Sequence, residues 1–248
     1  MGVSAITGSF ATPFVPLAYT AEFTPLTLGV DGGDPCIFPI APSALGASHV
    51  FKQLEAPLAT VQRLQLNGYY YRAVSHEHLA RPNPVPLFFL SSLKGGRYTP
   101  AYWGPPALYL AQDQVTPLAE VQAITFDELG RPVNRPGSGS WVTAEAQVDL
   151  KRVLDLTDST VCNHLGIDPA MLKAEWRSMQ TAALLTGAPL PFTQCLGYAV
   201  HQSKLFDGIL VHSARMPYDR ECLVVFPDRL ADGARVQVAS PKLSQTLP

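Results

Sequence analysis

The segment from Gly95 to Val121 most constrains how this chain folds. It begins with a Gly-Gly-Arg corner, passes through a proline-rich loop and continues into the short apolar run Ala107–Ala111. It then reaches Thr116, a favourable N-cap residue, and Pro117, which loses no hydrogen bond at the first position of a helix. We therefore predict a strand over residues 107–111 and a helix that begins at Pro117 and ends near Gly130.

Three side chains of this segment carry groups that could meet in one cleft. Arg97 has a planar guanidinium that can bond two oxygens at once, and Gly96 allows backbone amides to approach a ligand closely. Glu120 falls in the first turn of the predicted helix, where the helix dipole favours a carboxylate. Tyr109 supplies a phenol for stacking or hydrogen bonding. Each also has an ordinary interpretation, as a turn, an exposed helix start and a core aromatic residue.

A β-hairpin is predicted before this segment, because Asn67-Gly68 separates two strand-like runs, residues 60–66 and 69–74. Arg72 lies on the second run. This arginine could contribute to a ligand site or could be a solvent-facing strand residue, and the two interpretations are about equally well supported.

Neither the histidines nor the cysteines indicate a metal site. His76 and His78 alternate as two ligands on one strand face would, but no third ligand accompanies them. The four cysteines are far apart in the sequence and form no CxxC pair, so we also expect no disulfide framework and reduced thiols.

Composition narrows the class of protein. Apolar residues make up 47% of the 248 residues, which is enough for a sizeable core. A net charge of −2 gives no electrostatic attraction to nucleic acid or to anionic membranes. No run approaches the ~18 apolar residues of a membrane helix, and Pro13 and Pro16 interrupt the N-terminus where a signal peptide would be apolar. We expect a cytoplasmic location, in the producing cell or in a target cell that receives the protein.

The chain divides into three parts. Residues 1–60 form an irregular arm with seven of the 23 prolines, several aromatic residues and one short helix over residues 48–54. Residues 61–232 form the main domain and residues 233–248 a polar tail. Strands and helices alternate irregularly in the domain, which favours an α+β fold. Beyond the central segment we predict strands over residues 148–156, 208–212 and 222–226, and helices over residues 158–166, 169–185 and 194–204.

Several short motifs, in this order, resemble the RES domain family, which is named after an arginine, a glutamate and a serine. They are GGRYTP, ALYLA and LAEV, followed by VLDLTD and FDGILVHSAR. Together they cover roughly Tyr69 to Leu230, and their shared order makes the match more specific than any single motif. The resemblance implies a bacterial toxin that consumes NAD and is usually encoded beside an Xre-type antitoxin.

The resemblance also implies a fold and a set of site residues. The fold is similar to that of ADP-ribosyltransferases, with two small β-sheets flanked by helices around an NAD cleft. NAD is then the substrate, with no separate cofactor and no metal. The implied catalytic residues are Glu120, Arg97, Tyr109 and Ser213, and the implied NAD-binding residues are Arg72, Gly96 and Tyr98.

Cleavage of NAD at the nicotinamide–ribose bond fits this residue set. Nicotinamide departs as a neutral pyridine, so one ionised carboxylate that stabilises the ribosyl cation is sufficient and no acid is required. Tyr98-Thr99 stands where an aromatic residue and asparagine are expected, and the loop at residues 100–106 is slightly long, which leaves the acceptor open. The enzyme is then an NAD glycohydrolase or phosphorylase, or alternatively a mono-ADP-ribosyltransferase that modifies a protein.

Two other classes remain open at this stage. The domain could be a catalytically inert binding module, although four catalytic residue types of the family stand at its motif positions. The second class is an unrelated hydrolase that uses Ser138 or Ser213 with a histidine, but the Gly-x-Ser-x-Gly motif of a nucleophile elbow is missing. The expected partners are NAD, a cognate antitoxin or immunity protein and, as a possibility, a second copy of the chain.

Overall fold

The structure is a computed structural model that describes residues 44–79, 94–102, 104–239 and 245–247. Predictions about residues 1–43, including the prolines and aromatic residues of the arm, lie outside this part, as does the side chain of His78. Within the described part, strands and helices follow one another without regular alternation, which confirms the α+β fold class.

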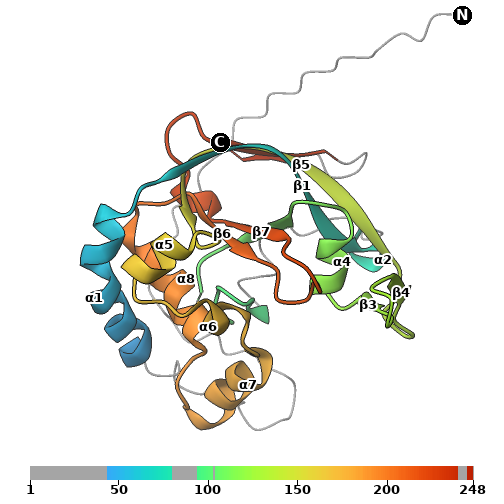
Figure 1. The fold of residues 1–248 in the computed structure, drawn as a ribbon, viewed down its shortest axis with the longest axis horizontal. Coiled ribbons are helices and arrows are strands. Elements are labelled where there is room, and N and C mark those ends of the chain that lie inside the picture. Colours follow the sequence, from blue (N-terminus) through green and yellow to red (C-terminus); the bar gives the residue numbers. More distant parts are fainter. Residues whose placement is uncertain (1–43, 80–93, 103, 240–244, 248) are drawn as a thin grey trace, which may run out of the picture. The chain divides into compact units, whose positions relative to one another are not determined.

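The main sheet has seven strands in the spatial order β1-β2-β7-β6-β5-β8-β9 (Figure 1). β1 pairs with both β2 and β5, so the pairings of β1, β2, β7, β6 and β5 form a closed ring. Only β5 and β6 run parallel among these described pairings. The strands are β1 (Leu64–Ser75), β2 (Leu108–Ala111), β5 (Trp141–Asp155), β6 (Gly208–His212), β7 (Glu221–Val225), β8 (Arg235–Ala239) and β9 (Gln245–Leu247).

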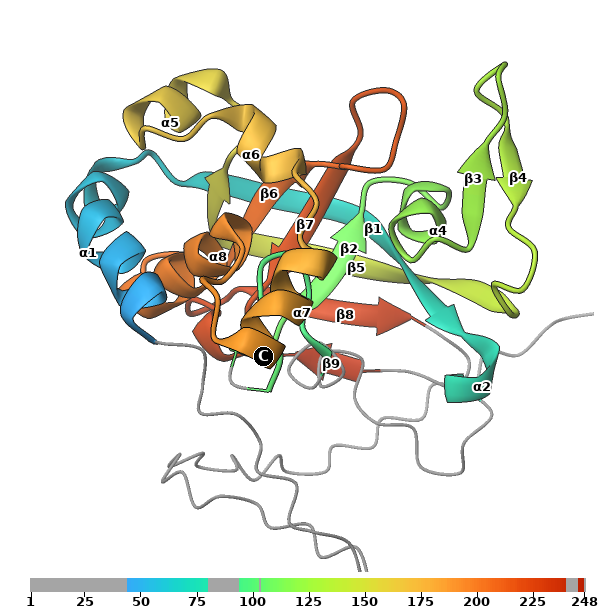
Figure 2. The ribbon, with the colours of Figure 1, turned by 90° about the horizontal axis from the view of Figure 1, so that it is seen from below.

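A separate two-stranded sheet, β3 with β4, extends beside the short helix α4, away from the main sheet (Figure 2). The other helices except α2 gather near the opposite end of the sheet (Figures 1 and 2). The remaining elements are α1 (Ala44–Thr60), α2 (His76–Leu79), α4 (Thr116–Glu120), β3 (Ile124–Phe126), β4 (Pro132–Asn134), α5 (Ser159–His164), α6 (Pro169–Lys173), α7 (Arg177–Thr186), α8 (Phe192–Ser203) and the 3-10 turn Pro227–Arg229.

Alternating side chains of the central strands divide the core into two layers. In β6, Ile209 belongs to the cluster beneath the helices, whereas Leu210 belongs to the cluster on the other face. In β7, Val224 and Leu223 divide in the same way. Because successive side chains of a strand point to opposite faces, these apolar runs are buried on both sides. The strands β6 and β7, which contribute Val211 and Val224 to the lining of the site, are therefore packed on both faces.

The predicted hairpin at Asn67-Gly68 is wrong. Both residues lie inside the continuous strand β1, where Asn67 pairs with Asp149 and Gly68 with Val148 of β5. The 15-residue strand β5 offers a partner along almost the whole of β1. Eleven register pairs with this partner favour an extended backbone, so the local preference of Asn-Gly for a tight turn is overridden.

Two predicted helices are shorter than expected. The helix that begins near Pro117 ends at Glu120, and the chain then turns into β3 instead of continuing to Gly130. The helix predicted over residues 169–185 is divided into α6 and α7 by the extended backbone of Ala174. The prediction for residues 194–204 agrees closely with α8.

The packed unit extends beyond the main domain outlined above. The helix in the arm is longer than predicted, and its residues Leu54 and Leu58 are buried in the core. Val236 and Val238 of β8, from the segment described as a polar tail, are buried in the second layer. Compact packing accordingly takes in the described residues from Ala44 onward as one unit.

Candidate functional site

The Gly-Gly-Arg corner forms a tight turn that is locked to β2 through Tyr109. Gly96 and Thr99 exchange backbone hydrogen bonds of 2.8 and 3.3 Å. The Tyr109 hydroxyl accepts from the Tyr98 amide over 3.0 Å and shares a hydrogen bond of 2.9 Å with Thr99 Oγ1. A Cβ atom on Gly96 would overlap the Tyr109 ring. Glycine is therefore needed for the ring to fit, and the Gly96 amide, which we expected to face a ligand, is used within the turn.

Two glutamines hold the same turn from behind. Gln194 of α8 has no solvent exposure, and its Nε2 donates to the Gly96 carbonyl oxygen over 2.9 Å and to the Gln180 side-chain carbonyl. Gln180 of α7 donates in turn to the Lys94 carbonyl oxygen over 3.3 Å. Neither residue was predicted as part of the site. The available signal was a polar side chain at position 194 within the apolar stretch of a helix.

Glu120 is positioned by α4, but not as predicted. The N-cap position of this helix is Val115 rather than Thr116, and it has no side-chain cap of its own. The Asp113 carboxylate, two residues earlier, accepts from the Val115 amide and from the Thr116 amide and hydroxyl, over 2.8–2.9 Å. Glu120 is the last helical residue, not a member of the first turn. The helix dipole therefore does not stabilise its charge, since the carboxyl end of a helix favours cations.

The Glu120 carboxylate is held by the loop that follows β6 instead. Its Oε1 accepts a hydrogen bond of 2.6 Å from the Ser213 hydroxyl and one of 3.2 Å from the Ala214 amide. Ser213 is almost fully buried, and its oxygen also accepts from the Arg215 and Met216 amides over 3.2 Å. Ser213 thus lies directly behind the carboxylate and acts on the cleft through it.

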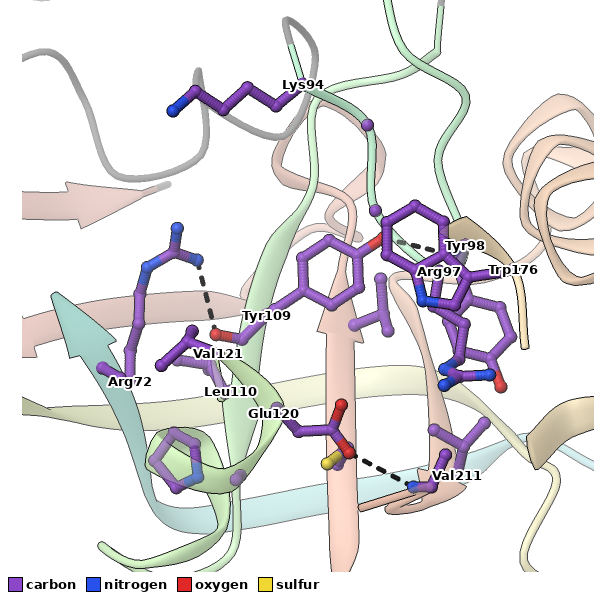
Figure 3. Close-up of a pocket in the computed structure, with 18 of the residues that line it drawn as sticks. Arg72, Lys94, Arg97, Tyr98, Tyr109, Leu110, Glu120, Val121, Trp176 and Val211 are labelled. Atoms are coloured by element: carbon purple, nitrogen blue, oxygen red, sulfur yellow. Dashed lines mark hydrogen bonds between the residues drawn. The ribbon is translucent and has the colours of Figure 1, made fainter. Parts of the chain in front are cut away.

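These elements surround a cleft of about 450 Å³, which lies within the usual range for small-molecule sites. Four basic side chains line it together with Glu120, the one carboxylate among its described lining residues. Figure 3 shows Glu120 beneath Tyr109, with Arg72 on one side and Arg97 on the other. The predicted site residues that line the cleft are Arg72, Gly96, Arg97, Tyr98, Tyr109 and Glu120.

The basic side chains enter the cleft from different elements. Arg72, on β1, donates to the Tyr109 carbonyl oxygen over 3.4 Å, and desolvation lowers its pKa to about 10. Because Arg72 lines the cleft, its interpretation as a solvent-facing strand residue is wrong. Arg97 donates to the carbonyl oxygens of Leu172 and Ala174 over 3.2 and 2.6 Å. Within the described residues, Arg97 and Lys94 form no ion pair.

Trp176 and Arg177 were not predicted as site residues. Trp176 was expected on the buried face of a long helix, but it stands in the break before α7 and lines the cleft. The Arg177 guanidinium carbon lies 4.9 Å from the centroid of the Trp176 ring. Burial and the nearby Arg215 lower the pKa of Arg177, although Glu120 opposes this shift. The clustering of like charges indicates a site that is suited to an anion.

Other kinds of site have less support in the described part of the chain. It contains no group of three or more His, Cys, Asp or Glu side chains that could hold a metal ion. None of its helices combines the length and the apolar character that a membrane crossing requires. Ser138 is absent from the described lining of the cleft, and the Ser213 hydroxyl donates to a carboxylate rather than to a histidine.

Fold and site together define an α+β domain with a cationic cleft around one fixed carboxylate. The RES domain model matches residues 70–247, so the chain belongs to the RES domain family. No curated protein matches the chain in sequence. Among solved structures, it is similar to a chain of the M. tuberculosis MbcT–MbcA toxin–antitoxin complex, with 18% identity and a TM-score of 0.45. This similarity covers 80% of the present chain and 91% of the other.

Proposed function

We propose that this protein is a toxin that consumes NAD by cleaving the bond between nicotinamide and ribose. The observation that carries this proposal is the pairing of one immobilised carboxylate, Glu120, with several cations in a cleft of suitable volume. Membership of the RES domain family supports the same function.

The basic wall of the cleft is suited to the pyrophosphate of NAD, which carries two negative charges. Lys94, Arg97 and Arg177 form no ion pair among the described residues, so a pyrophosphate would supply the missing counter-charge. The guanidinium groups can bond two oxygens each, and Arg72 adds a fourth positive charge at the β1 side. The anionic part of NAD would therefore bind along this wall.

Glu120 would act on the ribose. When the bond to nicotinamide breaks, the electron pair leaves with the nicotinamide nitrogen, which becomes neutral, and positive charge develops on the ribose. A carboxylate that is already fixed by Ser213 and Ala214 stabilises this charge without reorganisation during the reaction. Water as acceptor then yields ADP-ribose and a proton, whereas inorganic phosphate yields ADP-ribose 1-phosphate.

Mono-ADP-ribosylation of a protein uses the same bond cleavage and differs only in the acceptor. A toxin of this kind acts where NAD is present, in the cytoplasm of the producing cell or of a target cell. We include a cognate antitoxin or immunity protein in the proposal, because a producing cell has to be protected from loss of its own NAD.

Product analysis tests this proposal. The purified protein is incubated with NAD in buffers with and without inorganic phosphate, and the products are identified by mass spectrometry. With water or a protein side chain as acceptor, we expect free nicotinamide in both buffers, accompanied by ADP-ribose or by an increase in protein mass of one ADP-ribose. With phosphate as acceptor, we expect nicotinamide and ADP-ribose 1-phosphate only in the buffer that contains phosphate. Intact NAD in both buffers after prolonged incubation with the folded protein would contradict the proposal.

A further inference from the structure

A second cavity, of about 310 Å³, lies beside α4 and next to the β3–β4 hairpin. Ala119 lines this cavity, whereas its neighbour Glu120 lines the cleft described above. The floor is partly apolar, from Ile124 and Phe126 of β3. The cavity is thus separated from the first cleft by a single short helix, and it uses a different set of side chains.

The charged groups that line the second cavity are both guanidinium groups. They belong to Arg135, which follows β4, and to Arg215, in the loop after β6. No carboxylate is present among the described lining residues, and neither arginine forms an ion pair within the described chain. Arg131, in the same hairpin, instead forms an ion pair with Asp127 at 2.8 Å. Within the described chain, the positive charge of Arg131 is therefore compensated by a carboxylate, whereas the charges of Arg135 and Arg215 are not.

Two further observations indicate a missing acceptor. The Arg215 Nε atom is buried and has no hydrogen-bond partner among the described residues. A buried donor without a partner is destabilising, because it has lost its hydrogen bond to water. In addition, Arg215 lies close enough to Arg177 to lower the pKa of that residue. An anion beside Arg215 would accept a hydrogen bond from Nε and would reduce the repulsion between the Arg215 and Arg177 guanidinium groups.

Polar side chains between the two arginines fit an oxyanion with several oxygens. Arg135 Nη1 donates to Gln122 Oε1 over 3.3 Å, which orients the guanidinium at the cavity. Gln122 has a left-handed backbone, with a φ of 61°, at the turn from α4 into β3. Such conformations are uncommon for residues other than glycine and occur preferentially at functional sites. Thr125 adds a hydroxyl to the lining.

We propose that this cavity binds a tetrahedral dianion, either inorganic phosphate or a phosphate monoester. Two guanidinium groups match two negative charges and offer more donors than a carboxylate can accept. The volume is at the lower end of the range for ligand sites, which suits a small group and excludes a whole dinucleotide. The site does not depend on cleavage of NAD. It shares a loop with the first cleft, because the Arg215 amide donates to the Ser213 oxygen that supports Glu120.

Two separate experiments measure where the dianion binds and how tightly it binds. Crystals soaked in tungstate, a tetrahedral dianion, are examined by anomalous scattering, and we expect a peak between the Arg135 and Arg215 side chains. Calorimetric titration with inorganic phosphate and with O-phosphoserine measures binding in solution and distinguishes the two sources of the ligand.

The Arg135→Gln variant should weaken binding of the preferred probe at least tenfold, since Arg135 lines only the second cavity among the two described. Arg131→Gln is the matched control and should bind as the unmodified protein does. Unchanged binding by both Arg135→Gln and Arg215→Gln would overturn the proposal. A tungstate peak confined to the first cleft, or one without measurable binding in solution, would overturn it as well.

Discussion

The Ser213 hydroxyl donates a 2.6 Å hydrogen bond to Glu120 Oε1, although the two residues are 93 positions apart. Ser213 Oγ itself accepts from the Arg215 and Met216 amides, so the direction of its proton is restricted. The carboxylate is consequently fixed by a buried residue before any ligand binds. This relationship separates two roles: Glu120 faces the cleft, and Ser213 positions it.

Replacing Glu120 by glutamine should abolish most catalysis while preserving the fold. The amide keeps the size of the side chain but removes the charge that stabilises the ribosyl cation. Loss of one such electrostatic group costs roughly 10²–10³ in rate, with little effect on NAD affinity. Nicotinamide release and NAD binding are measured for this variant and for Glu128→Gln, an exposed control in the β3–β4 hairpin. A wild-type rate for Glu120→Gln would remove the main support for the proposed mechanism.

Ser213→Ala should cause a smaller loss than Glu120→Gln. It removes one of two hydrogen bonds to the carboxylate but leaves the Ala214 amide in place. A hydrogen bond to a charged group contributes roughly 1.5–3 kcal/mol, so we expect kcat to fall about tenfold or more. Ser203→Ala is the control, because the Ser203 hydroxyl also bonds the backbone but Ser203 is not among the described lining residues of the cleft. Equal rates for both variants would contradict a positioning role.

Arg97→Ala should act mainly on KM. A cation that binds pyrophosphate interacts equally with the ground state and the transition state, so its loss weakens binding more than it slows the chemical step. We expect KM for NAD to rise about tenfold with kcat changed much less. Lys173→Ala, which removes an exposed cation paired with Asp219 at 3.3 Å, should leave both constants unchanged. A fall in kcat with constant KM would instead assign Arg97 to the chemical step.

Local sequence signals correctly predicted those elements whose tertiary contacts favour the same conformation. The apolar run before Gln112 became β2, and Asp158 caps α5 as its position suggested, accepting from the Thr160 amide. The Asn67-Gly68 turn failed because its competitor, the long strand β5, is distant in sequence. A strand partner that is distant in sequence cannot be predicted from the residues around a turn, whereas a capping residue is adjacent to its helix and can be.

The site was predictable where the family motif names a residue and unpredictable where packing supplies it. Arg97, Tyr109 and Glu120 reach one cleft, as the motif implies. The role of Gln194 depends on the contact of α8 with a turn 98 residues earlier. Trp176 enters the cleft only because a helix that looked continuous is broken. Neither fact leaves a periodic signal in the sequence.

Gln194→Leu should lower both stability and NAD affinity. Leucine fits the apolar surroundings of α8 but leaves the Gly96 carbonyl oxygen without its buried donor, which costs roughly 1–3 kcal/mol. The turn that carries Lys94 and Arg97 should then lose its fixed position, so we expect KM to rise more than kcat falls. Thermal unfolding and steady-state kinetics are compared with those of Gln202→Leu, a partly exposed glutamine of the same helix. If only stability changes, Gln194 has a purely structural role.

The pH dependence of stability should reveal the contribution of Asp113, whose carboxylate accepts from the amides at the start of α4. Burial by itself raises the pKa of Asp113, but hydrogen bonds from Thr116 and Val115 and the guanidinium of Arg220 outweigh it and hold the pKa below 3.8. A carboxyl whose pKa is lower in the folded state stabilises the protein above its unfolded pKa. This stabilisation is lost as the pH falls through the lowered folded value.

Asp113→Ala should therefore reduce the free energy of unfolding by about 1 kcal/mol at neutral pH, because it removes a side-chain acceptor for the amides at the start of the helix. The difference from the unmodified protein should shrink as the pH falls below 3.8, because Asp113 then becomes protonated in both states. Asp113→Asn keeps a capping acceptor and should lose less stability than the alanine variant. Denaturant unfolding of the three proteins between neutral and strongly acidic pH measures these differences. A constant difference across this range would show that the charge of Asp113 does not stabilise the helix that carries Glu120.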